Sequence, residues 1–229
     1  MTPLAAKLRP PDDRICPMCH GYQRVMLDVA MFGKSIPCPT CGSAFQQDYL
    51  RNICGLPLDA QRTTFSQLTR YPFLSPALDR AQALVAAPSG FFTLTGPNGR
   101  GKSTLLHCLI NAGRAAGYTS VYASTADFLD HLRRAYDPAV AISYDGVMDK
   151  YMSATILCLD ELDAFKASAW AEEKFRQLID HRYQDRLHKL TAFATNARPE
   201  DLPPYLFSRM SDRESGAIYE IAGADLRRI

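Results

Sequence analysis

One short stretch constrains the fold of this chain more than any other. It reads G-x-x-x-x-G-K-S and consists of Gly96, Pro97, Asn98, Gly99, Arg100, Gly101, Lys102 and Ser103. An apolar run, 91–95, precedes it and another begins at Thr104, so the predicted order is strand, tight glycine turn and helix. Glycines allow consecutive backbone N–H groups to turn inward around a phosphate, and the start of a helix adds partial positive charge there.

This arrangement predicts a site for a nucleoside triphosphate, taken to be ATP, and we expect all eight residues together with Thr104 to line it. Lys102 is expected to reach the β- and γ-phosphates, and the Ser103 hydroxyl to complete the shell of a Mg²⁺ ion. The alternative is a chance glycine turn before a helix. The flanking strand and helix favour the phosphate-binding interpretation.

A second apolar run, 156–159, ends in two adjacent acids, Asp160 and Glu161. Apolar residues followed by acids predict a strand that is buried on both faces and whose carboxyl end emerges at a site. Asp160 is expected to bind Mg²⁺ together with Ser103, and Glu161 to orient and polarise the attacking water. Acids also end strands without any catalytic role. The phosphate loop upstream favours catalysis, and two adjacent acids favour hydrolysis over nucleotide storage.

Four of the seven cysteines stand in two C-x-x-C pairs near the amino terminus, with 18 residues between the pairs. They are Cys16, Cys19, Cys38 and Cys41. Both thiolates of such a pair can reach one ion, and four thiolates complete a tetrahedral Zn²⁺ shell of the structural kind. The alternatives are a redox pair or four unrelated buried thiols. Between the pairs, residues 22–27 alternate well enough to predict a strand, so a small hairpin is expected there.

The rest of the chain alternates predicted strands and helices. Helices are expected at 77–87, 104–116, 127–136 and 169–188, and strands at 119–123, 190–196 and 218–221. Ser124 or Thr125 can cap the helix over 127–136. Residues 137–153 are expected to be irregular, as an insertion or a helix-loop excursion. The strand over 190–196 ends in Asn196, whose amide can hydrogen-bond the γ-phosphate or the attacking water.

Composition adds little to these motifs. The 229 residues carry a net charge of +2, which permits a nucleic-acid partner without indicating one. No apolar run approaches the roughly 20 residues of a membrane helix, and residues 1–7 lack the apolar core of a signal peptide. Paired cysteines suit a reducing compartment and a metal. We therefore expect a cytoplasmic protein with no membrane partner.

Four stretches resemble, in order, the motifs of AAA+ ATPases of the bacterial helicase-loader group (DnaC/DnaI-like) and of their transposition-helper relatives (IstB-like). They are the phosphate loop, Leu159-Asp160-Glu161-Leu162, Thr195-Asn196 and Phe207-Ser208-Arg209-Met210. The resemblance extends from about Leu56 to the end of the chain. It implies an α/β fold with a parallel sheet flanked by helices, Asn196 as sensor 1 and Arg209 as an arginine finger. Such a finger acts on ATP held by a neighbouring subunit, which implies an oligomer with ATP at the subunit junctions.

These assignments divide the chain into a zinc-ribbon module (1–45), a linker (46–76) and an AAA+ ATPase domain (77–229). A full carboxyl-terminal helical lid, which many AAA+ proteins carry, is not expected after Ile221. Arg227 or Arg228 would then have to replace the sensor arginine that such a lid supplies. The alternative for both arginines is a charged, solvated tail.

The leading hypothesis is an ATP-dependent loader that binds a replicative helicase, gripped by the zinc module, and helps place it on single-stranded DNA. The second is an IstB-like transposition helper that binds duplex DNA and hands a site to a transposase. A metabolic P-loop kinase is disfavoured, because Asp160, Glu161 and Arg209 suit attack by water. Four basic side chains can contact DNA or simply lie on solvated helix faces: His131, Arg133, Arg134 and Lys150.

Overall fold

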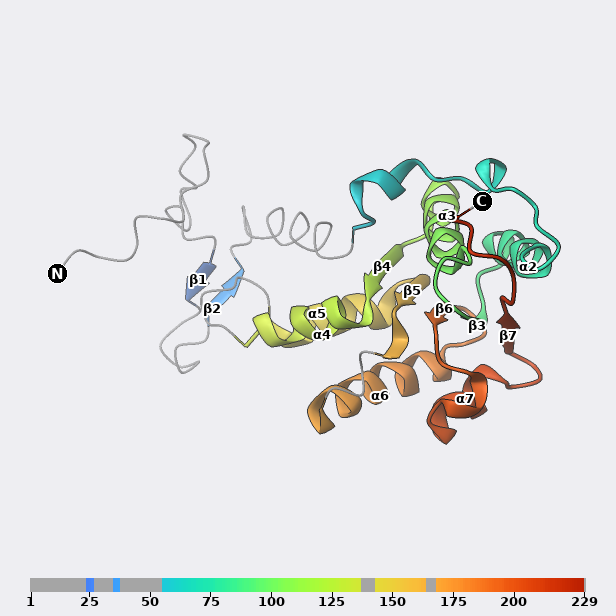
Figure 1. Cartoon of the computed structure of the whole chain (residues 1–229). Helices are drawn as coiled ribbons and strands as arrows, with labels where there is room; N and C mark the ends of the chain where they lie inside the picture. Colours follow the sequence, from blue (N-terminus) through green and yellow to red (C-terminus); the bar gives the residue numbers. More distant parts are fainter. Residues whose placement is uncertain (1–23, 27–34, 38–54, 137–142, 164–167, 229) are drawn as a thin grey trace.

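The computed structural model describes residues 24–26, 35–37, 55–136, 143–163 and 168–228 (Figure 1). Five parallel strands form the central sheet, in the order β4-β5-β6-β3-β7. Their bounds are β3 Gly90–Thr95, β4 Ser120–Ser124, β5 Ile156–Asp160, β6 Leu190–Thr195 and β7 Gly216–Glu220. Because the strands run in one direction, all five carboxyl ends lie at the same edge of the sheet. The predicted α/β fold with a parallel sheet is confirmed.

The three inner strands, β5, β6 and β3, are buried along their whole length. Successive residues of a strand point to opposite faces. Phe91 and Phe193 therefore join one core cluster, whereas Phe92 and Ala192 join the other. A sheet with apolar side chains on both faces requires helices on both faces.

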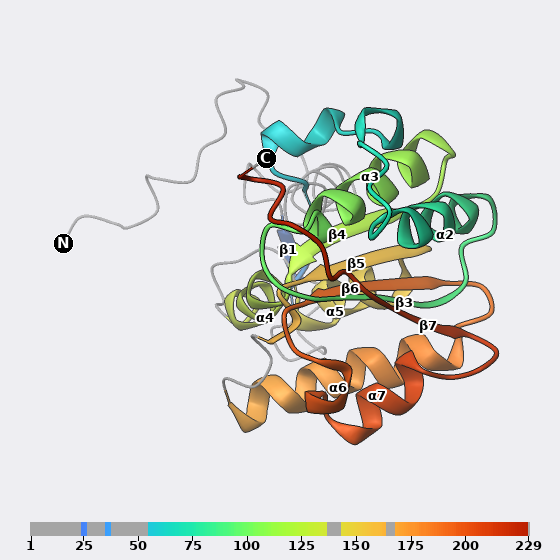
Figure 2. The ribbon, with the colours of Figure 1, turned by 45° about the vertical axis from the view of Figure 1, so that its right-hand side comes forward.

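Helices cover the sheet on its two sides (Figure 2). One side carries α2 (Ser75–Ala86) and α3 (Lys102–Ala115), and the other carries α4 (Thr125–Arg134), α5 (Tyr144–Ser153), α6 (Ala169–Gln184) and α7 (Pro204–Met210). Ser124 is the cap of α4, since its hydroxyl accepts the Asp127 N–H at 3.0 Å. Gly117, with φ of 86°, terminates α3 in the left-handed conformation expected of a helix stop.

The segment expected to be a linker, 46–76, is described from residue 55, and its last two residues begin α2. Its part before α2, 55–74, packs against α3. It contains two short 3₁₀ helices, η3 (Leu58–Arg62) and η4 (Phe65–Gln67). Asn111 Nδ2 on α3 donates to the carbonyl oxygens of Ala60 at 2.9 Å and Thr63 at 2.8 Å. Leu74 is buried in the same core cluster as α2 and α3. These residues therefore belong to the packing of the domain that holds the phosphate loop.

Of the two alternatives for residues 137–153, an insertion or a helix-loop excursion, the structure agrees with the second. It places α5 in this region, and the α5 cap Ser143 accepts the Gly146 N–H at 3.1 Å. Helix α7 follows a 3₁₀ turn, η6 (Pro199–Asp201), in a region for which the sequence pattern predicts no helix. The helix predicted over 169–188 ends earlier, at Gln184.

Nearer the amino terminus, β1 (Arg24–Met26) and β2 (Ser35–Pro37) form an antiparallel pair with Val25 opposite Ile36. This pair confirms the strand predicted between the cysteine pairs. The cysteines themselves, Cys16, Cys19, Cys38 and Cys41, lie outside the described residues. The Zn²⁺ shell therefore stays a prediction.

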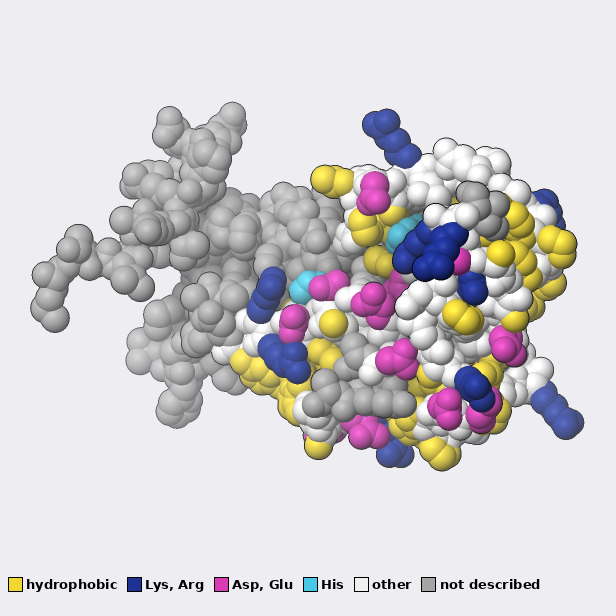
Figure 3. All heavy atoms as spheres, in the orientation of Figure 1, with side chains coloured by type: hydrophobic (Ala, Val, Ile, Leu, Met, Phe, Trp, Pro, Cys, Tyr) yellow, Lys and Arg dark blue, Asp and Glu magenta, His cyan; other side chains and the backbone are white. Residues whose placement is uncertain are grey.

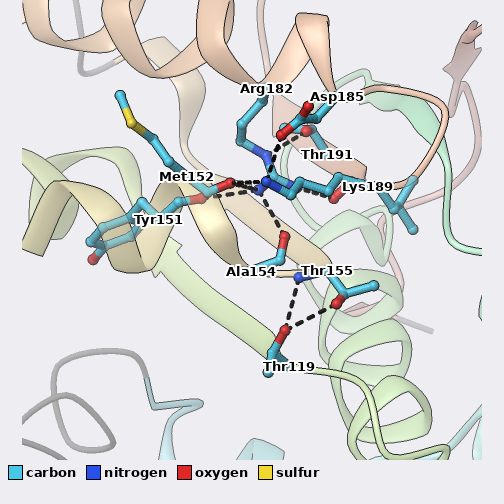
Figure 4. Close-up of polar contacts among 10 residues, drawn as sticks. Thr119, Tyr151, Met152, Ala154, Thr155, Arg182, Asp185, Lys189 and Thr191 are labelled. Carbon is cyan, nitrogen blue, oxygen red and sulfur yellow. Dashed lines mark hydrogen bonds and ion pairs between the residues drawn. The ribbon is translucent and has the colours of Figure 1, made fainter.

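Arg182 on α6 is fully buried and joins three elements (Figure 4). Its guanidinium donates, at 2.7 to 3.1 Å, to the carbonyl oxygens of Tyr151, Met152, Ala154 and Leu190 and to the Thr191 hydroxyl. The first three carbonyls belong to the end of α5, where a helix leaves such groups unpaired and favours a cation. Burial lowers the pKa of Arg182 to about 9, so the group is still charged at neutral pH. Arg182 thus fixes α5 and α6 to the start of β6.

Arg182→Met is expected to lower the free energy of unfolding by about 3 kcal/mol, because methionine leaves the buried carbonyl groups without donors. Unfolding in urea measures the loss. The control, Arg134→Met, removes an exposed arginine of α4 and should stay within about 0.5 kcal/mol of the parent. Equal losses in the two variants would contradict the anchoring role of Arg182.

Candidate nucleotide-binding site

The phosphate loop forms the turn between β3 and α3, at the edge of the sheet where the strands end. Three of its residues have positive φ: Gly96 (130°), Gly99 (76°) and Gly101 (87°). Residues with side chains rarely adopt such values. At Gly96 an added Cβ would also lie only 2.5 Å from the carbonyl oxygen of Ile221. The conformation of the loop therefore requires the glycines at these places.

Lys102, the first residue of α3, folds back over the loop. Its Nζ donates to the carbonyl oxygens of Gly96 at 2.6 Å and Pro97 at 2.8 Å, and to Asn196 Oδ1 at 3.0 Å. Burial lowers the pKa of Lys102, and the carboxylate of Asp160 opposes this shift. Asn196 follows β6, the neighbour of β3, so the sheet brings it to the lysine. The structure thus places Asn196 at the phosphate loop.

The carboxylate of Asp160, at the end of β5, accepts a hydrogen bond on each oxygen. The Tyr122 hydroxyl donates to Oδ2 at 2.9 Å, and the Glu161 N–H donates to Oδ1 at 2.8 Å. The Thr125 hydroxyl donates to the carbonyl oxygen of Asp160 at 3.0 Å. Burial and the nearby Asp160 raise the pKa of Tyr122, so the phenol remains protonated. These contacts fix the carboxylate close to Lys102.

Glu161 has φ of 51°, and no other non-glycine residue in the described part of the chain has a positive φ. A side-chain-bearing residue in this conformation costs about 1–3 kcal/mol, and such residues are concentrated at functional sites. Glu161 is also exposed, whereas Asp160 beside it is buried. The backbone outlier therefore coincides with the residue to which the sequence assigns the attacking water.

Ser103 and Asp160 fit the Mg²⁺ ion that accompanies ATP. The Ser103 side chain is exposed in the first turn of α3, and Asp160 is held at the adjacent strand end. Mg²⁺ takes hydroxyl and carboxylate oxygens, uses few protein ligands and keeps several waters. No group of three His, Cys, Asp or Glu side chains suited to a metal occurs among the described residues. The ion would therefore be shared between these two side chains, water and phosphate.

Two further side chains lie at this edge: Thr195, from the Thr195-Asn196 motif, and Asp163, which the sequence pattern does not single out. The Thr195 hydroxyl, at the end of β6, is 3.2 Å from both carboxylate oxygens of Asp163 and accepts the Ala197 N–H at 3.0 Å. The charge of Asp163 acts on Lys102 and raises its pKa against the effect of burial. Asp163 is thus a third acid beside Asp160 and Glu161. Only its place two residues after Glu161 could have indicated it.

The end of the described chain lies on the phosphate loop. The Leu226 N–H donates to the carbonyl oxygen of Gly99 at 2.7 Å. The Asp225 carboxylate occupies the space that a Cβ at Gly99 would need. The carboxyl-terminal segment after β7 is therefore held against the turn that would surround the phosphates.

This segment also adds positive charge to the site. The charges of Arg100 and Arg227 both lower the pKa of Lys102. Two guanidinium nitrogens of Arg100, Nε and Nη1, are buried without a hydrogen-bond partner among the described residues. Figure 3 shows Lys and Arg side chains gathered where the chain end meets α3. Both tail arginines are exposed, but of the two only Arg227 is among the charges that act on Lys102, so Arg227 is the better candidate for a phosphate contact.

Arg209 lies on α7, away from the phosphate loop of its own chain. Helix α7 covers one face of the sheet, and α3 covers the other (Figure 2). It pairs with Asp180 at 2.6 Å and donates to the carbonyl oxygen of Tyr205 at 2.8 Å. Its guanidinium carbon lies 5.3 Å from the ring centre of Tyr183. These partners belong to α6 and α7. Action on the ATP of a neighbouring subunit stays a prediction.

Residues 87–198 match the family model described as IstB-like ATP binding protein. This range contains the phosphate loop, Asp160, Glu161 and Asn196. Over this range the chain is similar to an IstB-like ATP-binding domain. No curated protein matches the sequence. In the described part of the chain, none of the helices has the length and apolarity needed to span a membrane.

Several solved replication proteins have a fold similar to that of this chain. The replication initiator DnaA bound to AMPPCP and single-stranded DNA aligns with a TM-score of 0.62 and 19% identity, over 71% of this chain and 50% of that one. DnaI aligns with a TM-score of 0.59 and 20% identity, over 75% of this chain and 94% of the DnaI chain. The DnaC helicase loader aligns with a TM-score of 0.54 and 18% identity, over 72% of this chain and 100% of the DnaC chain. The chain spans about half the length of the two AMPPCP-bound DnaA structures that it matches.

Proposed function

We propose that this protein hydrolyses ATP and that the bound nucleotide controls its assembly with a protein partner on DNA. The observation that supports hydrolysis is the meeting of Lys102, Asn196, Asp160 and Glu161 at one edge of the sheet. Lysine and amide groups suit a triphosphate, and the two acids suit a metal and a water. A site for nucleotide storage alone would not need the exposed Glu161.

The residues have separate tasks in this reaction. ATP, bound with Mg²⁺, supplies the phosphoanhydride bond that is broken. Lys102 exchanges the carbonyl oxygens of Gly96 and Pro97 for phosphate oxygens, and the loop amides hold the rest of the triphosphate. Glu161 orients a water toward the γ-phosphorus and accepts its proton, while the new P–O bond forms and ADP leaves. Asn196 hydrogen-bonds the water or the γ-phosphate.

The partner that we propose is a replicative helicase, which the protein helps to place on single-stranded DNA. The likeness of fold to the DnaC helicase loader, to DnaI and to a DnaA bound to single-stranded DNA supports this choice. The zinc-ribbon module would grip the helicase. The family match itself favours a second function, that of a transposition helper which binds duplex DNA and delivers it to a transposase.

Capture experiments separate the two functions. The full chain, loaded with AMPPCP, is incubated with the replicative helicase of its host and with any transposase encoded beside its gene. Nucleotide-dependent capture of the helicase supports the loader, and capture of the transposase alone supports the helper. Capture of neither would contradict both. Helicase capture that survives deletion of residues 1–45 would exclude a gripping role for the zinc module.

Arg209→Ala should lower ATP hydrolysis by about 100-fold, because a charge that stabilises the transferred phosphoryl group is lost. Mixing this variant with Lys102→Ala subunits should restore activity, since the second variant still offers Arg209 to ATP held by its neighbour. Arg176→Ala is the control, because Arg176 shares the partner Asp180 but has no proposed part in the reaction. Steady-state hydrolysis across mixing ratios measures the effect. No recovery at any ratio would contradict action between subunits.

A further inference from the structure

Tyr122 contacts the two elements that supply the proposed Mg²⁺ ligands. It lies on β4, beside β5, and its hydroxyl donates to Asp160 Oδ2 at 2.9 Å. On its other side, its ring meets the His107 ring of α3 edge-on, with 4.8 Å between the ring centres. His107 lies one helical turn after Ser103, so the two side chains share a face of α3. Tyr122 therefore links the helix that carries Ser103 to the strand that carries Asp160.

The phenol completes the hold on the Asp160 carboxylate. One oxygen, Oδ1, already accepts the Glu161 N–H of the adjoining backbone. That bond alone would leave the carboxylate free to swing about it, whereas the second bond to Tyr122 fixes the plane of the group. A carboxylate has about four lone-pair positions, so two bonds leave others free for a metal ion or its water. The hydroxyl thus orients Asp160 without using up its capacity as a ligand.

We infer that Tyr122 is a positioning residue for Mg²⁺, which acts by holding the Asp160 carboxylate in the orientation that the ion requires. The inference rests on the proposed function, because it needs ATP and Mg²⁺ to bind at this edge of the sheet. Partners that hold ligating side chains commonly change metal affinity by about 10-fold or more when they are removed. Packing alone would predict a different result, since phenylalanine keeps the ring and its contact with His107.

The test measures nucleotide affinity and does not depend on turnover. Binding of AMPPCP to the full chain is measured by calorimetry, first in EDTA and then at increasing Mg²⁺ concentration. For Tyr122→Phe, the affinity in EDTA should equal that of the parent, and the Mg²⁺ concentration that gives half of the metal-dependent gain should rise about 10-fold. The matched control is Tyr118→Phe, because the Tyr118 hydroxyl donates to the carbonyl oxygen of Ala86 at 3.4 Å, away from Asp160.

The outcomes are distinguishable. A parent protein whose AMPPCP binding shows no gain with Mg²⁺ would overturn the proposed function and this inference with it. The inference alone would be overturned if AMPPCP binding by the parent increases with Mg²⁺ and the Mg²⁺ dependence of Tyr122→Phe is identical to that of the parent. In an Asp160→Asn background, Tyr122→Phe should have no further effect on the Mg²⁺ dependence. A further loss of Mg²⁺ dependence in that background would show that Tyr122 acts independently of Asp160, and it would also overturn the inference. Urea unfolding confirms that each variant is folded.

Discussion

Glu161→Gln is expected to bind ATP with the affinity of the parent and to hydrolyse it about 1,000-fold more slowly, because an amide cannot accept the proton of the attacking water. The substitution keeps the size of the side chain, and the exposed position leaves no core to disturb. The backbone conformation, with φ of 51°, is unfavourable for both residues and so does not separate them. Binding of a fluorescent ATP analogue and release of phosphate measure the two quantities independently.

The control for Glu161 is another acid at the same edge of the sheet. Glu220 ends β7 just as Asp160 ends β5, and it is exposed. Glu220→Gln should hydrolyse ATP at close to the parent rate. If Glu161→Gln also kept that rate, then Glu161 would be an ordinary strand-ending acid and the catalytic assignment would be wrong.

Lys102→Ala should weaken ATP binding by about 1,000-fold, which corresponds to the loss of two charge-assisted hydrogen bonds of about 2 kcal/mol each. The lysine already lies at the loop, where its ammonium group is held by Gly96, Pro97 and Asn196. Lys174→Ala removes a lysine of α6 that pairs with Glu173 and should leave binding unchanged. Near-parent affinity of Lys102→Ala, in protein shown to be folded by its urea unfolding curve, would place the triphosphate elsewhere.

The pH dependence of binding gives the same lysine a second test. Burial lowers the pKa of Lys102 below the ordinary 10.5, so the ligand-free protein loses this proton at a lower pH than a free lysine does. A bound triphosphate favours the charged form. ATP affinity should therefore fall as the pH rises toward 10.5, and this fall should be absent in Lys102→Ala.

The part of the site that the sequence predicts is the part encoded by local patterns. The phosphate loop needs glycines at fixed spacing, and a buried parallel strand that ends in acids needs little context. Parallel topology then brings the ends of β3, β5 and β6 together, which is why Lys102 and Asn196 meet although they are 94 positions apart in the sequence. Local patterns and parallel topology are therefore enough to predict that these strand ends meet, without knowledge of individual side-chain contacts.

The features that sequence patterns miss depend on individual side-chain contacts across the fold. Tyr122 alternates within β4 like any half-buried residue, and its bond to Asp160 spans 38 positions. Arg182 stands in a helix rich in charged residues, where an arginine ordinarily faces solvent, yet the end of α5 and the start of β6 supply its acceptors. Helix α5 itself contains Gly146, which weakens the helical pattern. The zinc, the domain divisions and the role of Arg209 remain predictions.

The hydrogen bond between Leu226 and Gly99 has a practical consequence for anyone who labels this protein. Any displacement of residues 225–228 must also stretch or break a bond to the turn that would enclose ATP. A fluorophore attached at the carboxyl terminus should therefore report nucleotide occupancy from within the same polypeptide. For the same reason, a purification tag fused there would perturb the affinity being measured, so binding constants are best determined on protein whose carboxyl terminus is unmodified.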